Sequence, residues 1–234
     1  MRRGGFVVVA LFALLFALSG CGDSSEGSGD SSNAHINEES GSINDLLADD
    51  RTGPVPPPAK VTDMREAADQ ANCFLLVGTA PAKGKQVPPG APAPKYQTEP
   101  PASGPYVEPP HQQADGAYLN MPEAINQVAA LDHGRLAIQY APDLSEEIQL
   151  EMKGLYDTMY GATLFFPNDE MEYAVAATTW TNFLGCPGWE EQKTIDAIRA
   201  FGMETWGKHG SEPVESFPFE GPTPAEPEEP ESSE

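Results

Sequence analysis

Proline limits where this chain can form regular structure. Most of its 24 prolines lie in three stretches, residues 54–58, 78–106 and 213–230. Proline lacks a backbone N–H and fixes φ, so it interrupts helices and the hydrogen-bond ladders of sheets. We therefore expect one folded domain at residues 61–210, which contains a long Pro/Gly-rich loop and is flanked by segments without regular structure.

The two flanking segments have the composition of solvated chain. Residues 21–60 are rich in Ser, Gly, Asp and then Pro, and they offer few large apolar side chains to offset the entropy of ordering, so a flexible, disordered spacer is expected. Within it, residues 43–50 could instead form a short recognition helix. Residues 211–234 carry eight glutamates and no Lys or Arg. This predicts a disordered acidic tail or, alternatively, a tail that collects cations or docks a partner.

The charge of the chain excludes some classes of partner. It has 36 acidic and 13 basic residues, a formal net charge of -23. Phosphate groups are bound by Lys and Arg, so we expect neither nucleic acid nor anionic lipid as a partner.

The first twenty residues have the pattern of a secretory signal peptide. Arg2 and Arg3 precede an uncharged apolar run, residues 6–18. This run is shorter than the roughly 20 residues that a helix needs to cross a bilayer, so residues 1–20 are predicted to be a signal peptide rather than a membrane span.

The end of this segment, Leu18-Ser19-Gly20-Cys21, resembles the lipobox of bacterial lipoproteins. The resemblance implies that a signal peptidase cuts before Cys21, which then carries acyl chains and anchors the protein to the cell membrane in the envelope. Gly22 would favour the outer membrane by the sorting rule of enteric bacteria, so the protein is expected in the outer membrane or facing the periplasm. The alternative is an ordinary signal peptide with a chance cysteine.

Residue periodicity predicts the elements of the folded part. We expect helices within residues 62–73, 143–161 and 190–210, and strands within residues 73–78, 135–142, 162–168 and 172–182. Thr62 and Ser145 are the expected N-caps of the first two helices. Leu136, Ile138 and Tyr140 alternate with other residues, which predicts a half-buried strand.

In the last helix, Ile195, Ile198, Phe201 and Met203 fall roughly along one face. The order of these elements predicts an α+β fold, in which a small mixed sheet is packed by two to three helices.

Two cysteines remain once Cys21 is assigned to lipid. In an exported protein such a pair most often forms a disulfide, so we predict that Cys73 is bonded to Cys186. A redox or metal-binding thiol and two unpaired buried thiols are the alternatives.

One of the four histidines lies in the triplet Asp132-His133-Gly134, directly before a predicted strand. Taken alone, the triplet could be a catalytic histidine held by an aspartate. It also fits a tight turn into the strand, in which Gly134 supplies backbone freedom and Asp132 a turn hydrogen bond.

Several motifs together resemble a bacterial family known as domain of unknown function 3105. They are QVPPG at residues 86–90, YQTEPPASGPY at 96–106, GAY at 116–118, AALDHG at 129–134 and TTW at 178–180, ahead of Cys186. The family pattern has histidines where this chain has Gln86, Tyr106 and Ala129, and only His133 keeps its place.

A group of histidines with a carboxylate would suit a transition metal. The departures from the family pattern imply that any such site is lost or rebuilt here. The candidate ligand site then comprises Asp132, His133, Tyr106, His111 and Tyr118, and neither a metal nor another cofactor can be named. His111 is either a relocated ligand or an exposed loop residue.

Three functions remain open. The first is a non-catalytic binding or structural domain of a membrane-anchored lipoprotein, with an envelope protein as a possible partner. The second is a metal-binding domain built around His133. The third is a hydrolase with His133 as general base. Because the sequence has no G-x-S-x-G, HExxH or P-loop motif, we do not expect an enzyme.

Overall fold

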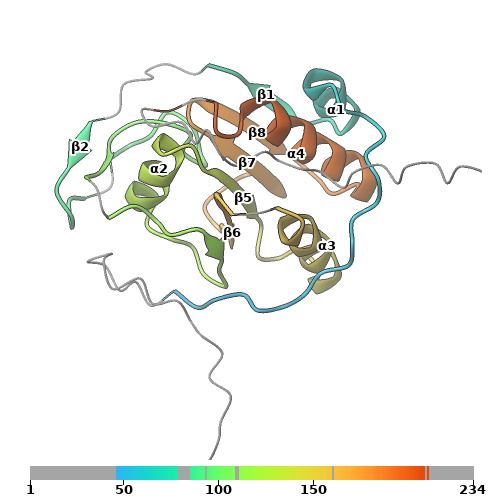
Figure 1. Cartoon of the computed structure of the whole chain (residues 1–234), viewed down its shortest axis with the longest axis horizontal. Helices are drawn as coiled ribbons and strands as arrows, with labels where there is room; N and C mark the ends of the chain where they lie inside the picture. Colours follow the sequence, from blue (N-terminus) through green and yellow to red (C-terminus); the bar gives the residue numbers. More distant parts are fainter. Residues whose placement is uncertain are drawn as a thin grey trace, which may run out of the picture. The chain divides into compact units, whose positions relative to one another are not determined.

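The computed structural model describes residues 46–78, 85–92, 94–108, 111–159, 161–208 and 210. The chain has an α+β fold built on a mixed six-stranded sheet (Figure 1). Its helices are α1 (Met64–Gln70), α2 (Ala124–Asp132), α3 (Glu146–Asp157) and α4 (Glu191–Thr205). The strands are β1 (Phe74–Leu76), β2 (Gln86–Val87), β3 (Tyr106–Val107), β4 (Gly116–Ala117), β5 (Leu136–Tyr140), β6 (Thr163–Pro167), β7 (Val175–Thr179) and β8 (Asn182–Cys186).

Strand β5 lies inside the large sheet, whose order is β1-β8-β7-β5-β6-β4. It pairs in parallel with β6 and antiparallel with β7. The β7–β8 hairpin extends the sheet on one side to β1, and β4 forms the opposite edge, parallel to β6. A separate small sheet joins β2 and β3 in parallel within the Pro/Gly-rich region.

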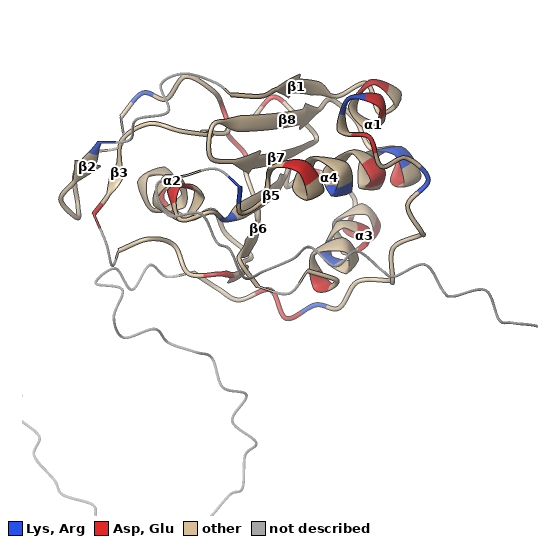
Figure 2. Ribbon diagram, turned by 45° about the horizontal axis from the view of Figure 1, so that its top comes forward, with Lys and Arg blue, Asp and Glu red and all other residues tan. Residues whose placement is uncertain are grey.

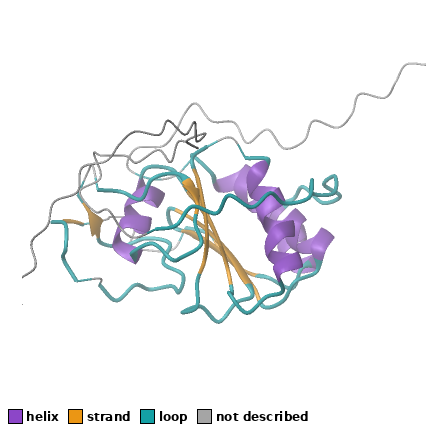
Figure 3. Cartoon of the chain, turned by 90° about the horizontal axis from the view of Figure 1, so that it is seen from below, coloured by secondary structure: helices purple, strands orange, loops and turns teal. Residues whose placement is uncertain are grey.

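Helices cover both faces of the large sheet (Figure 3). Leu136, Ile138 and Tyr140 of β5 belong to the core cluster that also contains buried residues of α1, α3 and α4. Ala137 belongs to a second cluster, with buried residues of α2. All five residues of β5 are therefore buried, and the expectation of a half-buried strand is wrong because α2 covers its second face.

Periodicity missed strand β8, the short strands β2, β3 and β4, and helix α2. Its residues from Ile125 to Asp132 are all buried. A helix that is buried all round has no polar stripe, so it lacks the alternation by which an amphipathic helix is recognised.

The other helices form where their residue patterns predict them, with differences at the N-cap of α1 and at Met203 of α4. Asp63, not Thr62, caps α1, because its Oδ1 accepts from the N–H of Glu66 at 2.9 Å. Ser145 caps α3 as expected, accepting from Ile148 at 3.4 Å. In α4 the side chain of Met203 is 52% exposed and lies off the buried face.

The predicted disulfide is confirmed. Cys73 and Cys186 are bonded across a sequence separation of 113 residues, next to β1 and at the end of β8. None of the helices among the described residues is long and apolar enough to cross a membrane. Acidic and basic residues lie on α1, α3 and α4 (Figure 2).

Residues 46–60, which composition assigns to the spacer, lie against the domain and are called here the N-terminal strap. Its first part extends the edge of β4: the backbone N–H of Asp49 donates to the carbonyl of Ala117 at 2.9 Å, and the carbonyl of Leu47 accepts from the N–H of Leu119 at 2.8 Å. Residues 46–50 are not helical, and Ala48 instead forms a β-bridge with Tyr118. The chain therefore joins the domain well before residue 61.

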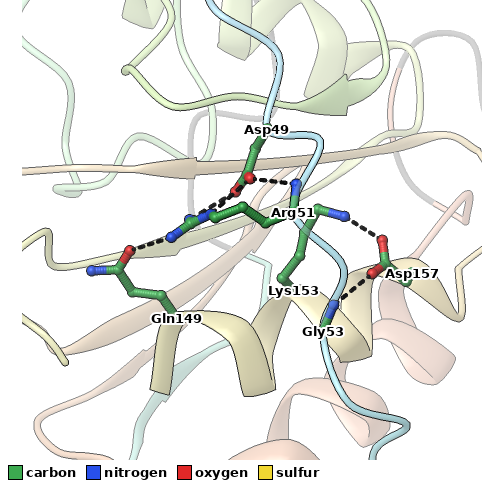
Figure 4. A network of polar contacts seen from close by, with 6 residues as sticks. All are labelled: Asp49, Arg51, Gly53, Gln149, Lys153 and Asp157. Atoms are coloured by element: carbon green, nitrogen blue, oxygen red, sulfur yellow. Dashed lines mark hydrogen bonds and ion pairs between the residues drawn. The ribbon is translucent and has the colours of Figure 1, made fainter. Parts of the chain in front are cut away.

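Beyond β4 the strap crosses α3, as Figure 4 shows. Arg51 forms an ion pair with Asp49 at 2.8 Å and donates to the side chain of Gln149 at 3.2 Å. The N–H of Gly53 donates to Asp157 at 3.3 Å, and Asp157 also pairs with Lys153.

The end of the strap reaches α4. Arg199 donates to the carbonyl of Pro57, and the N–H of Lys60 donates to Asp196 at 3.2 Å. Backbone N–H and carbonyl groups of the strap make much of this contact with the domain. A segment rich in Pro and Gly can therefore still be held against the domain.

Candidate functional site

The Asp-His-Gly triplet ends α2 and leads into β5. His133 is the C-cap residue of α2, and its N–H donates to the carbonyl of Ala129 at 3.2 Å. Gly134 has a φ of 81°, a conformation that glycine adopts without strain. Arg135 donates from Nη1 to the carbonyl of His133 at 2.9 Å. The triplet thus forms a turn between helix and strand, as the glycine indicates.

Two glycines that follow α4, Gly207 and Gly210, contact this turn through their backbone. The N–H of Gly207 donates to the carbonyl of Gly134 at 3.3 Å. Gly210 lies so close to Asp132 that a Cβ on it would overlap the Asp132 carbonyl oxygen. Asp132 itself is only 1% exposed. This backbone contact places the end of the described chain at the C-terminus of α2.

The two candidate tyrosines lie in or against the apolar cluster that α2 covers. Tyr106 is buried and packs edge to face on Trp180, with ring centroids 5.9 Å apart. The hydroxyl of Tyr118 donates to the carbonyl of Ala114 at 2.7 Å, and burial raises its pKa. A buried, raised-pKa phenol stays protonated at neutral pH, which makes it a poor metal ligand.

His111 lies near the other end of α2. Two residues after it, the backbone N–H of Gln113 donates to the carbonyl of Asn126 at 3.0 Å. Asn126 lies in the first turn of the helix. Asn126 and His133 are separated by roughly 10 Å along the helix axis, at about 1.5 Å per residue. The two candidate histidines are therefore associated with opposite ends of α2.

Across the described ranges there is no group of three or more His, Cys, Asp or Glu residues that could hold a metal ion. The five candidate residues are thus arranged around α2 as parts of turns and of an apolar cluster.

A cavity lies at the N-terminus of α2 instead. It has a volume of about 300 Å³ and is lined by Pro94, Lys95, Tyr96, Gln97, Thr98, Glu99, Ala124 and Glu170. Ala124 is the first residue of α2, and Glu170 follows β6. The segment 94–99 is the loop before β3, so three parts of the chain meet here.

The pKa of Glu99 reflects its position in this cavity. Burial raises the pKa of Glu99, and the negative charge of Glu170 raises it further. Burial also raises the pKa of Tyr96, with a further contribution from Glu99. The hydroxyl of Tyr96 donates to the carbonyl of Pro105 at 3.0 Å, which fixes its ring at the cavity wall.

Sequence reasoning did not select these cavity residues. Tyr96 and Glu99 stand within the YQTEPPASGPY motif, but this motif supports the family resemblance and does not mark either residue as a ligand. Glu170 lies in a polar turn after β6, and only the packing of that turn beside the motif pairs it with Glu99.

A family model described as "protein of unknown function (DUF3105)" matches residues 92–215, which is more than half of the 234-residue chain. The matched range includes every motif that carries the family resemblance except QVPPG at residues 86–90. No curated protein and no solved structure gives a significant match.

Proposed function

This chain belongs to the DUF3105 family, and we propose that it is a membrane-anchored lipoprotein of the bacterial cell envelope whose domain binds a ligand or an envelope partner without catalysing a reaction. Anchoring is assigned to acyl chains on Cys21, after removal of residues 1–20.

The observation that carries the proposed location is the bond between Cys73 and Cys186. Disulfides form and persist in oxidising compartments such as the periplasm and the cell surface, and they are rare in the cytosol. This agrees with the signal-peptide pattern at residues 1–20, which independently favours export.

The strap supports a tethered arrangement. Residues 22–45 separate Cys21 from the strap and, if extended, can span up to roughly 80 Å at about 3.3 Å per residue. With its first contacts at the edge of β4, the strap transmits any pull on the anchor to the folded domain.

The cavity supports binding rather than catalysis. None of its lining residues is His, Cys or Ser, so it holds neither a Ser–His nor a Cys–His pair. His133, the residue with the clearest catalytic potential in the sequence, is the C-cap of α2 at the other end of the helix.

Acyl labelling in a bacterial host tests the anchor. Cells expressing the full chain are grown with a radioactive fatty acid, and the protein is partitioned between detergent and aqueous phases. We expect the label and detergent partitioning in the wild type, and neither of them in Cys21→Ser. The double variant Cys73→Ser/Cys186→Ser is the matched control and keeps the label. An unlabelled wild-type protein, or a labelled Cys21→Ser variant, would contradict the anchor.

An activity screen tests the non-catalytic role. Ester, glycoside and phosphate-ester substrates are offered to the purified full chain and to His133→Ala. Turnover that disappears in His133→Ala would replace the binding function with a hydrolase.

A further inference from the structure

The strap adds little to the apolar core of the domain. None of the three apolar clusters among the described residues includes a residue of 46–60. Within the strap only Asp49 and Pro56 are buried, whereas Leu47 is 63% and Val55 87% exposed. Burial of apolar surface is the main favourable contribution to folding, so the domain keeps its core when the strap is detached.

Polar contacts on three separate elements hold the strap in place. At its N-terminal end, backbone groups of Leu47 and Asp49 pair with the edge of β4. Arg51 then bonds to α3, and the carbonyl of Pro57 accepts from Arg199 of α4. These contacts follow one another along a segment that passes around the domain (Figure 1). A pull at the N-terminal end of the strap therefore loads them in sequence rather than together.

The strap also covers a charge that is only partly satisfied. Arg199 is buried, and its Nε and Nη2 have no hydrogen-bond partner among the described residues. Because Pro57 contacts this guanidinium, removal of the strap opens the group to water. An unsatisfied buried donor is unfavourable, and its hydration offsets part of the contacts that are lost on detachment.

The detachment has a defined end. Val61 packs against the largest apolar cluster, to which α1 contributes buried residues. Cys73 follows α1 and is bonded to Cys186, so a pull along the chain that reaches Cys73 continues through the disulfide. When the chain is pulled at its two ends, the backbone between these cysteines is bypassed and carries no load. This part includes α2, α3 and strands β1 to β7.

We propose that the strap is a switch that responds to tension: a pull on the lipid anchor detaches residues 46–60 as one unit, from β4 to α4, while the rest of the domain stays folded. Detachment uncovers the edge of β4, where Ala117 and Leu119 lose their backbone partners, and it exposes Arg199. The domain thus has two states, and tension selects between them. The inference rests on the proposed lipid anchor for the source of the pull.

Hydrogen exchange of the purified, ¹⁵N-labelled full chain tests whether the strap opens by itself. The N–H of Leu119 donates to the carbonyl of Leu47 in the strap. The N–H of Tyr118, its neighbour in sequence, donates to Phe165 of β6 instead. We expect the amide of Leu119 to exchange at least about a hundredfold faster than that of Tyr118, because a partial opening requires less free energy than global unfolding. The amide of Asp49 should exchange at the same rate as that of Leu119.

Two variants identify the contact responsible. Arg51→Met removes the ion pair with Asp49 and the bond to Gln149. The amides of Asp49 and Leu119 should then exchange about tenfold faster, because charged hydrogen bonds contribute roughly this factor. Arg65→Met is the matched control, since it removes the same charge from an exposed position of α1. It should leave both rates as they are in the wild type.

A single-molecule pulling experiment tests the response to tension. The full chain, with Cys21→Ser to remove the lipidation site, is held by handles at its two ends. We expect a first, reversible lengthening of at most roughly 50 Å, the extended length of residues 46–60 at about 3.3 Å per residue. The rest of the domain should unfold only at a higher force. Arg51→Met should lower the force of the first step and leave that of the second unchanged.

The proposal is overturned if the amide of Leu119 exchanges as slowly as that of Tyr118, or if Arg65→Met accelerates exchange as much as Arg51→Met. It is also overturned if the chain lengthens in a single step, because the strap and the domain then unfold together. Both measurements use protein without acyl chains. Their outcome is independent of acyl labelling at Cys21, so the failure of the switch and the failure of the anchor are distinguishable.

Discussion

Gly53 of the strap packs against Gly154 of α3, backbone against backbone. A Cβ on Gly53 would overlap the backbone nitrogen of Gly154, and a Cβ on Gly154 would overlap the carbonyl oxygen of Pro54. The absence of side chains at both positions is therefore what allows the strap to cross the helix.

A methyl group at Gly154 should detach this crossing. We expect Gly154→Ala to lower the free energy of unfolding by about 1–3 kcal/mol, because the overlapped atoms are backbone and cannot rotate away. Alanine has a better helix propensity than glycine, and this difference acts in the opposite direction by about 1 kcal/mol. Amide hydrogen exchange should therefore be the sharper measurement, with faster exchange in residues 47–53. Gly188→Ala is the control, since a Cβ there meets nothing within 4 Å. Equal exchange in both variants would show that the strap does not depend on this contact.

The partly buried ion pair between Arg51 and Asp49 should make the attachment of the strap sensitive to acid. Burial alone would raise the pKa of Asp49, but hydrogen bonds and the positive charge of Arg51 outweigh it and lower the pKa below the ordinary 3.8. A carboxyl group whose pKa is lower in the folded state stabilises that state above its unfolded pKa, and this contribution is lost as the pH falls through the folded value. Urea unfolding of the wild type and of Asp49→Asn should thus differ most near neutral pH, and the difference should shrink as the pH falls below 3.8 and then through the lower folded pKa of Asp49. A constant difference down to acid pH would contradict this account.

The fold was predictable where burial is one-sided. Helix α3 combines a serine N-cap, acidic residues in its first turn and an apolar stripe, and each of these is a local signal. Helix α2 is buried all round, so its sequence carries no polar stripe, whereas the alternation in β5 predicted a strand but not the burial of its second face. The strap is held by backbone hydrogen bonds and close glycine contacts, which composition cannot reveal.

Tertiary packing also decides which residues form the candidate site. The sequence selected His133 because histidine next to aspartate has obvious chemistry, and the structure places it as a helix C-cap. Glu99 and Glu170 carry no motif of their own. They become neighbours only because the loop before β3 and the turn after β6 meet at the N-terminus of α2, which is a consequence of tertiary packing.

Reduction of the disulfide should destabilise the domain substantially. The bond between Cys73 and Cys186 closes a loop between residues 113 positions apart, and reduction of a disulfide typically costs about 2–4 kcal/mol of stability. Thermal unfolding with and without reductant measures the effect. The double variant Cys73→Ser/Cys186→Ser should unfold at the lower temperature and should not respond to reductant. If reductant shifted both proteins alike, the shift would come from another source.

Substitutions at Gly134 test whether the Asp-His-Gly triplet acts as a turn between α2 and β5. With a φ of 81°, Gly134 occupies the left-handed region, where an alanine costs about 1–2 kcal/mol. We expect Gly134→Ala to lower the free energy of unfolding by this amount, measured by urea denaturation. Gly134→Asn should lose less, because asparagine enters this region more readily. If the two substitutions destabilise the protein equally, the cost arises from crowding at the turn rather than from backbone conformation.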